Sequence, residues 1–168
     1  MTPSPQLEKI LAGTLAGTSI MTASSYALSN SMKEQFREPV ILSILLKRLL
    51  KQNDKGNHLT GWILHYSVGL FFNTVYDRIW NTTRFRPTIG NGLLLGAISG
   101  LIGFSVWKTT FRLHPNPPRL DFEKYYAQIV AVHLVFGIFS ALGYRKVPVH
   151  TKEKEVNLRP PLKPTIQI

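Results

Sequence analysis

The chain has 168 residues, with 20 lysines and arginines against 9 aspartates and glutamates, a net charge of +11. It contains no cysteine, which excludes disulfides, thiolate metal sites and thiol catalysis within this sequence. The basic residues lie between apolar runs and in the C-terminal segment, not interleaved with aromatic residues over a polar surface. We therefore expect contact with the lipid bilayer and its anionic headgroups, and no nucleic-acid partner.

Charged residues are absent from four runs of 18 to 23 residues, at 10–32, 59–76, 87–107 and 125–144. A helix rises about 1.5 Å per residue, so each run covers roughly the 30 Å hydrocarbon core of a bilayer. The sequence predicts an all-α, four-transmembrane-helix bundle in a single membrane domain, 1–146, with spans at about 7–29, 59–80, 89–111 and 122–144. Ser4 and Asp121 are the expected N-caps of the first and last spans.

The remaining segments fit this scheme. The Pro-rich tail, 147–168, is predicted to be disordered. The first run contains many Ser, Thr and Gly residues, so a cleaved signal peptide is the alternative there, although its start has few basic residues.

Between the first two runs, 39–52 is short, apolar on one side and basic on the other. We predict one interfacial amphipathic helix whose Lys47, Arg48 and Lys51 reach lipid headgroups; docking onto a partner is the alternative.

One phrase occurs twice in the sequence. His65-x-x-x-Gly69 is followed by Tyr76, and His133-x-x-x-Gly137 is followed by Tyr144 with the same spacing. A second, shorter phrase, Gly-x-Leu-x-Gly, begins at residues 13 and 92, in the first and third runs. These matches predict an internal repeat: two tandem helical hairpins related by pseudo-twofold symmetry about the membrane normal.

The histidines are the first candidate site. The second and fourth spans run in the same direction, so His65 and His133 are expected at the same depth, with His58 and His114 toward the same face. Neutral imidazole can bind a transition metal or haem iron. The structural interpretation is a hydrogen bond to a neighbouring helix, and it is favoured because no zinc-type spacing is present. The hydroxyl partners for it are Thr14, Thr18, Thr22 and Ser25 in the first span.

Small residues form a second pattern. Lipid tails give helices no hydrophobic reason to pair, so glycines that allow close backbone approach take that role. The glycines expected at helix contacts are Gly13, Gly17, Gly69, Gly92, Gly96, Gly100, Gly103 and Gly137. The functional alternative is that they line a pore or fit a flat ligand.

A polar pair is predicted near the opposite face of the membrane. Asp77 and Arg145 each lie twelve residues after a repeat histidine. We expect Asp77 to form an ion pair with Arg145 or Arg78, because pairing cancels two costly charges, with Asn73 one helical turn away.

The glycine-rich spans, the His-x-x-x-Gly phrases and the His114-Pro-x-Pro-Pro loop together resemble small four-span bacterial integral membrane proteins of unknown function. The resemblance covers about residues 7–146. It implies an α-helical protein of the bacterial inner membrane and no particular activity.

No catalytic triad, phosphate loop or nucleotide fingerprint is present in the sequence. The expected function is a non-enzymatic packing, interaction or ligand-binding module. The alternatives are a bis-histidine haem or metal-binding redox protein, and a small transporter or channel component that acts as a homo-oligomer. Basic residues are equally frequent on the two sides, and the first span weakly favours both termini outside the cytoplasm.

Overall fold

The computed structural model describes residues 4–50 and 58–148. Its elements are α1 (Pro5–Met32), α2 (Glu38–Leu49), α3 (Leu59–Thr82), α4 (Ile89–Leu113) and α5 (Phe122–Lys146). The described part of the chain contains no strand, which confirms the predicted all-α class. Lys51 lies outside the described residues, and so does the predicted tail except for Val147 and Pro148.

Side-chain caps fix where three of the helices begin. Ser4 Oγ accepts a hydrogen bond from the Leu7 N–H at 3.3 Å, and Asp121 Oδ1 accepts one from the Lys124 N–H at 3.2 Å. Both caps were predicted from the sequence. Thr88 caps α4 in the same way, through the Asn91 N–H at 3.2 Å. Each cap satisfies a backbone donor that has no partner inside the helix.

Two of the helices are long and apolar enough to cross a membrane by length and composition: α4 and α5. The four-span arrangement is therefore supported only in part. α1 and α3 have sufficient length, but polar side chains dilute their apolar content. In α1 these are the serines and threonines, and in α3 they are His65, Asn73 and Asp77.

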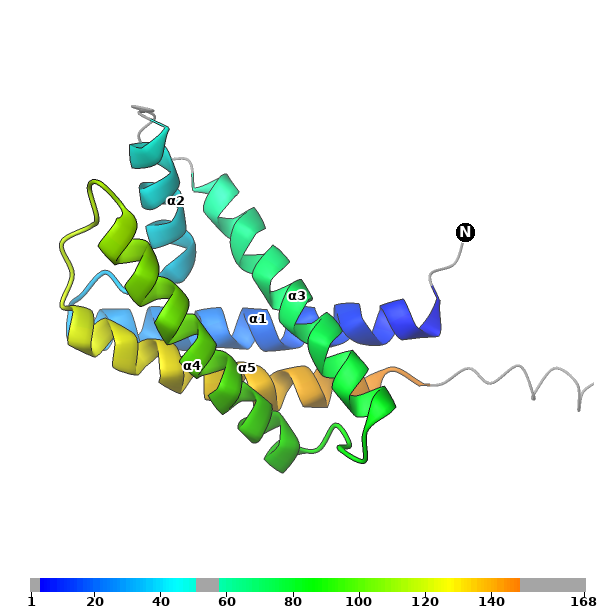
Figure 1. The fold of residues 1–168 in the computed structure, drawn as a ribbon. Coiled ribbons are helices and arrows are strands. Elements are labelled where there is room, and N and C mark those ends of the chain that lie inside the picture. The colour runs from blue at the N-terminus through cyan, green and yellow to red at the C-terminus, as the bar shows by residue number, and fades with distance from the viewer. Residues whose placement is uncertain (1–3, 51–57, 149–168) are drawn as a thin grey trace, which may run out of the picture.

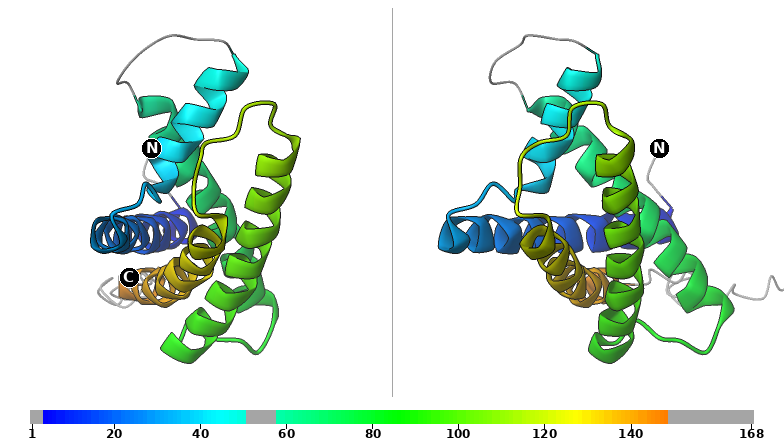
Figure 2. Two further views of the ribbon diagram at one scale, coloured as in Figure 1. Left: turned by 90° about the vertical axis from the view of Figure 1, so that its left-hand side faces the viewer. Right: turned by 60° about the vertical axis from the view of Figure 1, so that its left-hand side comes forward.

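α5 is the central helix of the molecule. α1 and α4 both pack along it, and α3 contacts α1 and α2 less extensively. The backbones of α3 and α4 stay apart, although the Tyr76 and Ser99 hydroxyls form a hydrogen bond between them. α1 and α5 lie side by side, and α3 and α4 run obliquely across them (Figures 1 and 2). The start of α1, the α3–α4 connection and the end of α5 lie toward one end of the molecule. α2 and the α4–α5 connection lie toward the other (Figure 1).

Glycine explains why α5 has such close neighbours. A Cβ atom added to Gly137 would lie 2.0 Å from the Gly92 carbonyl oxygen, and one on Gly96 would lie 2.4 Å from the His133 carbonyl oxygen. On the other side of α5, a Cβ on Gly17 would lie 3.0 Å from the Phe136 carbonyl oxygen. These backbones can approach only without side chains, so the glycines hold α1 and α4 against α5.

The structure does not have the predicted pseudo-twofold symmetry. The repeat would make the contact between α3 and α4 equivalent to the contact between α1 and α5, yet only the second is an extensive packing of backbones. α3 and α4 meet through a few side chains such as Tyr76 and Ser99. The reason lies in the α1 glycines. Gly13 and Gly17 of α1 let the helix approach the α5 backbone at Ser140 and Phe136, whereas toward α3 Gly13 meets only the Asn73 side chain. α1 therefore packs more closely on α5 than on α3, its own predicted hairpin partner.

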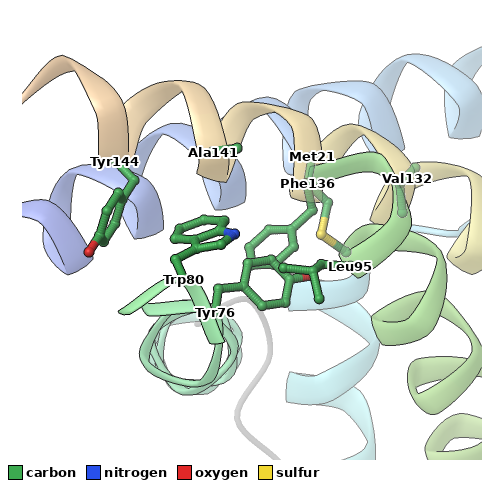
Figure 3. Packing of buried hydrophobic residues seen from close by; sticks show 8 residues of the cluster. All are labelled: Met21, Tyr76, Trp80, Leu95, Val132, Phe136, Ala141 and Tyr144. Atoms are coloured by element: carbon green, nitrogen blue, oxygen red, sulfur yellow. The ribbon is translucent and has the colours of Figure 1, made fainter. Parts of the chain in front are cut away.

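Two apolar clusters lie at the two ends of α5. The first is a chain of aromatic rings in which Trp80 lies between Tyr144 and Tyr76, with ring centroids 4.7 Å and 5.6 Å apart (Figure 3). Its other buried members are Met21, Leu95, Val132, Phe136 and Ala141. The second cluster joins α2 to the bundle through Phe36, Ile41, Leu45, Phe111, Tyr125 and Ile129.

α2 is therefore attached to this chain's own helices. Ile41 is fully buried, and a Cβ on Gly61 of α3 would lie 1.9 Å from the Pro39 carbonyl oxygen. Arg48 is exposed, and its guanidinium donates to the Asn116 carbonyl oxygen at 3.1 Å. Lys47 is half-buried.

Candidate functional site

His65 contacts α1, the helix in which the hydroxyl partners were predicted. Its Nε2 lies 2.8 Å from Thr22 Oγ1, and that hydroxyl also lies 2.7 Å from the Thr18 carbonyl oxygen. A hydroxyl has one hydrogen and a carbonyl can only accept, so Thr22 donates to Thr18 and accepts from His65 Nε2–H. The Nδ1 of His65 then keeps its lone pair.

His133 is bound within its own helix instead. Its Nδ1 lies 2.8 Å from the Ile129 carbonyl oxygen, so Nδ1 carries the hydrogen and Nε2 keeps the lone pair. A Cβ on Gly103 of α4 would lie 3.2 Å from this Nε2. The rings of Phe72 and Phe136 pack against the imidazole, each with its centroid 6.2 Å away.

The two repeat histidines line one cavity of about 140 Å³. All five helices contribute to its wall, and most of its lining is apolar. The lining residues are Thr18, Met21, Glu38, Leu42, His65, Val68, Gly69, Phe72, Ile102, Gly103, Val106, Trp107, His133 and Phe136. The structure thus brings together the two histidines that the repeated phrase singled out.

His58 and His114 do not join them. His114 Nε2 lies 3.0 Å from the Leu45 carbonyl oxygen, and its Nδ1 accepts the Asn116 N–H at 3.1 Å, so both ring nitrogens are occupied. His58 does not line the cavity, and its buried Nδ1 has no hydrogen-bond partner among residues 4–50 and 58–148. Within residues 4–50 and 58–148, no three His, Cys, Asp or Glu side chains are placed to hold a metal ion.

Glu38, the first residue of α2, is the cavity residue that sequence reasoning missed. Its side chain is 2 % exposed. Oε1 accepts a hydrogen bond from Gln128 Nε2 at 3.4 Å, and Oε2 has no partner among the described residues. Burial raises the pKa of Glu38 to about 7, although the hydrogen bond from Gln128 opposes this shift. In the sequence, Glu38 is recognisable only as an acidic residue directly before an apolar run. That position does not show whether its side chain points into the protein or outward.

Asp77 is not in the predicted ion pair. Its Oδ1 accepts hydrogen bonds from Tyr144 Oη at 2.6 Å and Asn81 Nδ2 at 2.9 Å, and from the Gln6 amide. Arg145 and Arg78 are both exposed and make no ion pair with it. Adjacent helical residues point about 100° apart, so Tyr144 faces Asp77 where its neighbour Arg145 cannot.

Asn73 is fully buried one turn before Asp77. Its amide nitrogen donates to the Gly69 carbonyl oxygen at 3.0 Å and to Ser140 Oγ at 3.2 Å. It therefore links α3 to α5. The transporter interpretation requires Asn73 to face water, which this burial does not support.

All eight predicted glycines lie at contacts with another helix. A Cβ on Gly69 would lie 2.1 Å from Thr18 Oγ1, and one on Gly100 would lie 3.1 Å from the His133 Cβ. Gly100 and Gly103 are the two that face the His133 side chain, and Gly100 also meets the Val130 backbone. They make room for the imidazole beside the cavity.

Comparisons with protein-family models, with curated proteins and with solved structures gave no match.

Proposed function

We propose that this chain is an integral membrane protein that crosses the bilayer four times, through α1, α3, α4 and α5. The proposal is supported by the outward-facing apolar side chains at the middle of the two more polar helices. Leu15 on α1 is 59 % exposed and Phe71 on α3 is 64 % exposed. On α1 the exposed Leu7, Leu11 and Leu15 recur every four residues and so form a stripe along the helix. An exposed apolar stripe is unfavourable in water and is typical of a lipid-facing surface. In this proposal the α3–α4 connection lies on the same side of the membrane as both termini.

We further propose that the protein is a non-enzymatic ligand-binding module. The observation that carries this proposal is the largely apolar cavity with both repeat histidines in its wall. Few convergent polar groups in an apolar cavity are typical of ligand sites. At about 140 Å³ the cavity is well below the roughly 300–1,000 Å³ of cofactor pockets, so a haem macrocycle does not fit it as it stands.

The four crossings are tested with single cysteines, because the sequence has none of its own. Leu15→Cys and Phe71→Cys should resist a water-soluble maleimide in sealed vesicles and react once the protein is denatured. Lys33→Cys, after α1, and Arg84→Cys, after α3, are the controls and should react from opposite sides of the membrane. Labelling of Leu15→Cys or Phe71→Cys in intact vesicles would contradict the proposal.

A further inference from the structure

The cavity wall includes four polar side chains that are almost fully buried. They are Thr18, Glu38, His65 and His133, exposed by 1 %, 2 %, 6 % and 6 %. Two of their oxygens, Thr18 Oγ1 and Glu38 Oε2, have no hydrogen-bond partner in the described part of the chain. A buried polar atom without a partner costs about 1–3 kcal/mol, so a ligand that supplies one would gain that energy.

These polar groups are mainly hydrogen-bond acceptors. His65 Nδ1 and His133 Nε2 keep lone pairs, because the other nitrogen of each ring already donates to Thr22 or Ile129. Above pH 7, where the Glu38 carboxyl is ionised, its oxygens accept as well. The described residues that line the cavity include no lysine or arginine. The polar part of the wall therefore suits a headgroup that carries several N–H donors and a positive charge.

Two other lining residues reach the surface. Val68 on α3 and Val106 on α4 both line the cavity, yet they are 49 % and 57 % exposed. α3 and α4 are joined through Tyr76 and Ser99, about two helical turns away, and we infer that the cavity opens between Val68 and Val106. In a bilayer this mouth would face the acyl chains, and a ligand would enter from the side.

Resting on the ligand-binding function proposed above, we propose that the cavity binds the ammonium headgroup of a single-chain amphiphile, with Glu38, His65 and His133 as acceptors. An apolar cavity of about 150 Å³ holds one benzene molecule, so about 140 Å³ takes the headgroup and a few methylenes. The rest of the chain leaves between Val68 and Val106. A fatty-acid headgroup is disfavoured, because it would place a second carboxylate beside Glu38.

The test uses the full chain at about pH 8, where Glu38 is ionised, in nanodiscs of phosphatidylcholine, which carry no net surface charge. The protein is titrated with dodecylamine below its micellar concentration. Dodecylamine should saturate at one molecule per chain. Dodecyltrimethylammonium has the same charge and no N–H donor, so it should bind at least ten-fold more weakly to the unaltered protein. Equal affinity of the two amphiphiles would overturn the assignment of acceptors without any variant having to fold.

Two pairs of variants separate the headgroup from the cavity. Glu38→Gln should weaken dodecylamine binding at least ten-fold, whereas the exposed Glu123→Gln should not change it. Val106→Trp at the mouth should abolish binding, whereas Leu101→Trp, on α4 but outside the cavity, should not.

The outcomes are distinguishable. If Val106→Trp abolishes binding and Glu38→Gln leaves it unchanged, the cavity binds amphiphiles but the headgroup proposal is wrong. If neither dodecylamine, dodecanol nor dodecanoate saturates, or if Val106→Trp binds all three normally, the ligand-binding function itself fails.

Discussion

The two sides of α4 differ sharply. Toward α5, glycines let the two backbones touch, and a Cβ on Gly137 has no space. Toward α3, the side chains of Val106 and Val68 are about half exposed beside a cavity. The helix therefore has one side that cannot accept another carbon atom and one that leaves room for a ligand. The comparison teaches that glycines facing a backbone make the tight contacts of this bundle. The cavity lies where α4 presents larger side chains beside Gly103.

The largest effect is expected from Gly137→Ala. The new Cβ would meet backbone atoms of Gly92 and Gly96, which cannot move aside as a side chain could. We expect the free energy of unfolding to fall by about 1–3 kcal/mol or more, which is measured as a lower thermal midpoint in detergent. The matched control is Gly90→Ala on α4, whose Cβ would meet nothing within 4 Å. Equal midpoints for the two variants would contradict the tight α4–α5 contact.

Glu38→Gln should flatten the pH dependence of stability. The folded-state pKa of about 7 lies above the ordinary 4.5, so between these values the folded chain holds a proton that the unfolded chain releases. The stabilisation of the folded state by this proton is fully present below pH 4.5 and is lost as the pH rises through 7. The free energy of unfolding should change by on the order of 3 kcal/mol over this interval. Thermal midpoints across this interval provide the measurement.

The other titratable or charged groups near Glu38 are Arg37 beside it, His65 from α3, and Tyr125 and His133 from α5. They are present in the unaltered protein and in both variants, so their contributions cancel in the comparison. Glu123→Gln should keep the slope of the unaltered protein. A Glu38→Gln variant with that same slope would show that Glu38 is not the group that titrates.

Tyr144→Phe should cost more than Arg145→Gln. The first removes a hydroxyl that donates to the buried Asp77 carboxylate, worth about 1.5–3 kcal/mol. The second removes an exposed charge that makes no ion pair with Asp77 and should change the unfolding free energy by less than about 0.5 kcal/mol. If Arg145→Gln lowered the free energy of unfolding more than Tyr144→Phe, the result would support the Asp77–Arg145 ion pair predicted from the sequence.

The smallest effect is expected at the His65 contact. Thr22→Val removes the acceptor of His65 Nε2–H and should cost about 0.6–2 kcal/mol. Thr74→Val is the matched control, because the Thr74 hydroxyl bonds the carbonyl four residues earlier, as Thr22 does, but contacts no histidine. Indistinguishable midpoints for the two variants would mean that this bond adds no stability.

The helices were largely predictable because charge-free runs, caps and prolines are local signals. The predicted interfacial helix at 39–52 corresponds to α2, and the last three predicted spans begin where α3, α4 and α5 begin. The sequence also indicated that His65 and His133 belong together.

Which helices pack against each other, and which way their side chains point, could not be predicted from such local signals. The repeat gives α1 and α4 similar glycines, but only the packed structure shows that both helices use them against α5. The prediction that Asp77 pairs with Arg145 was wrong, and the partner is its neighbour Tyr144. Counting residues along a helix gives the position of a side chain along the axis but not its direction around the axis. Glu38 was missed because a single acidic residue at a helix start is ordinarily exposed and close to the helix dipole.

The central claim is that the opening between α3 and α4 admits a single-chain ligand from the bilayer. Trp107 lines the cavity, whereas Trp62 and Trp80 do not. We propose to measure quenching of tryptophan fluorescence by dodecylamine brominated in mid-chain, in nanodiscs, with the unaltered protein and with Trp107→Phe. The account predicts quenching that saturates at one molecule per chain and is lost in Trp107→Phe. Quenching that rises without saturation, or that persists in Trp107→Phe, would contradict it.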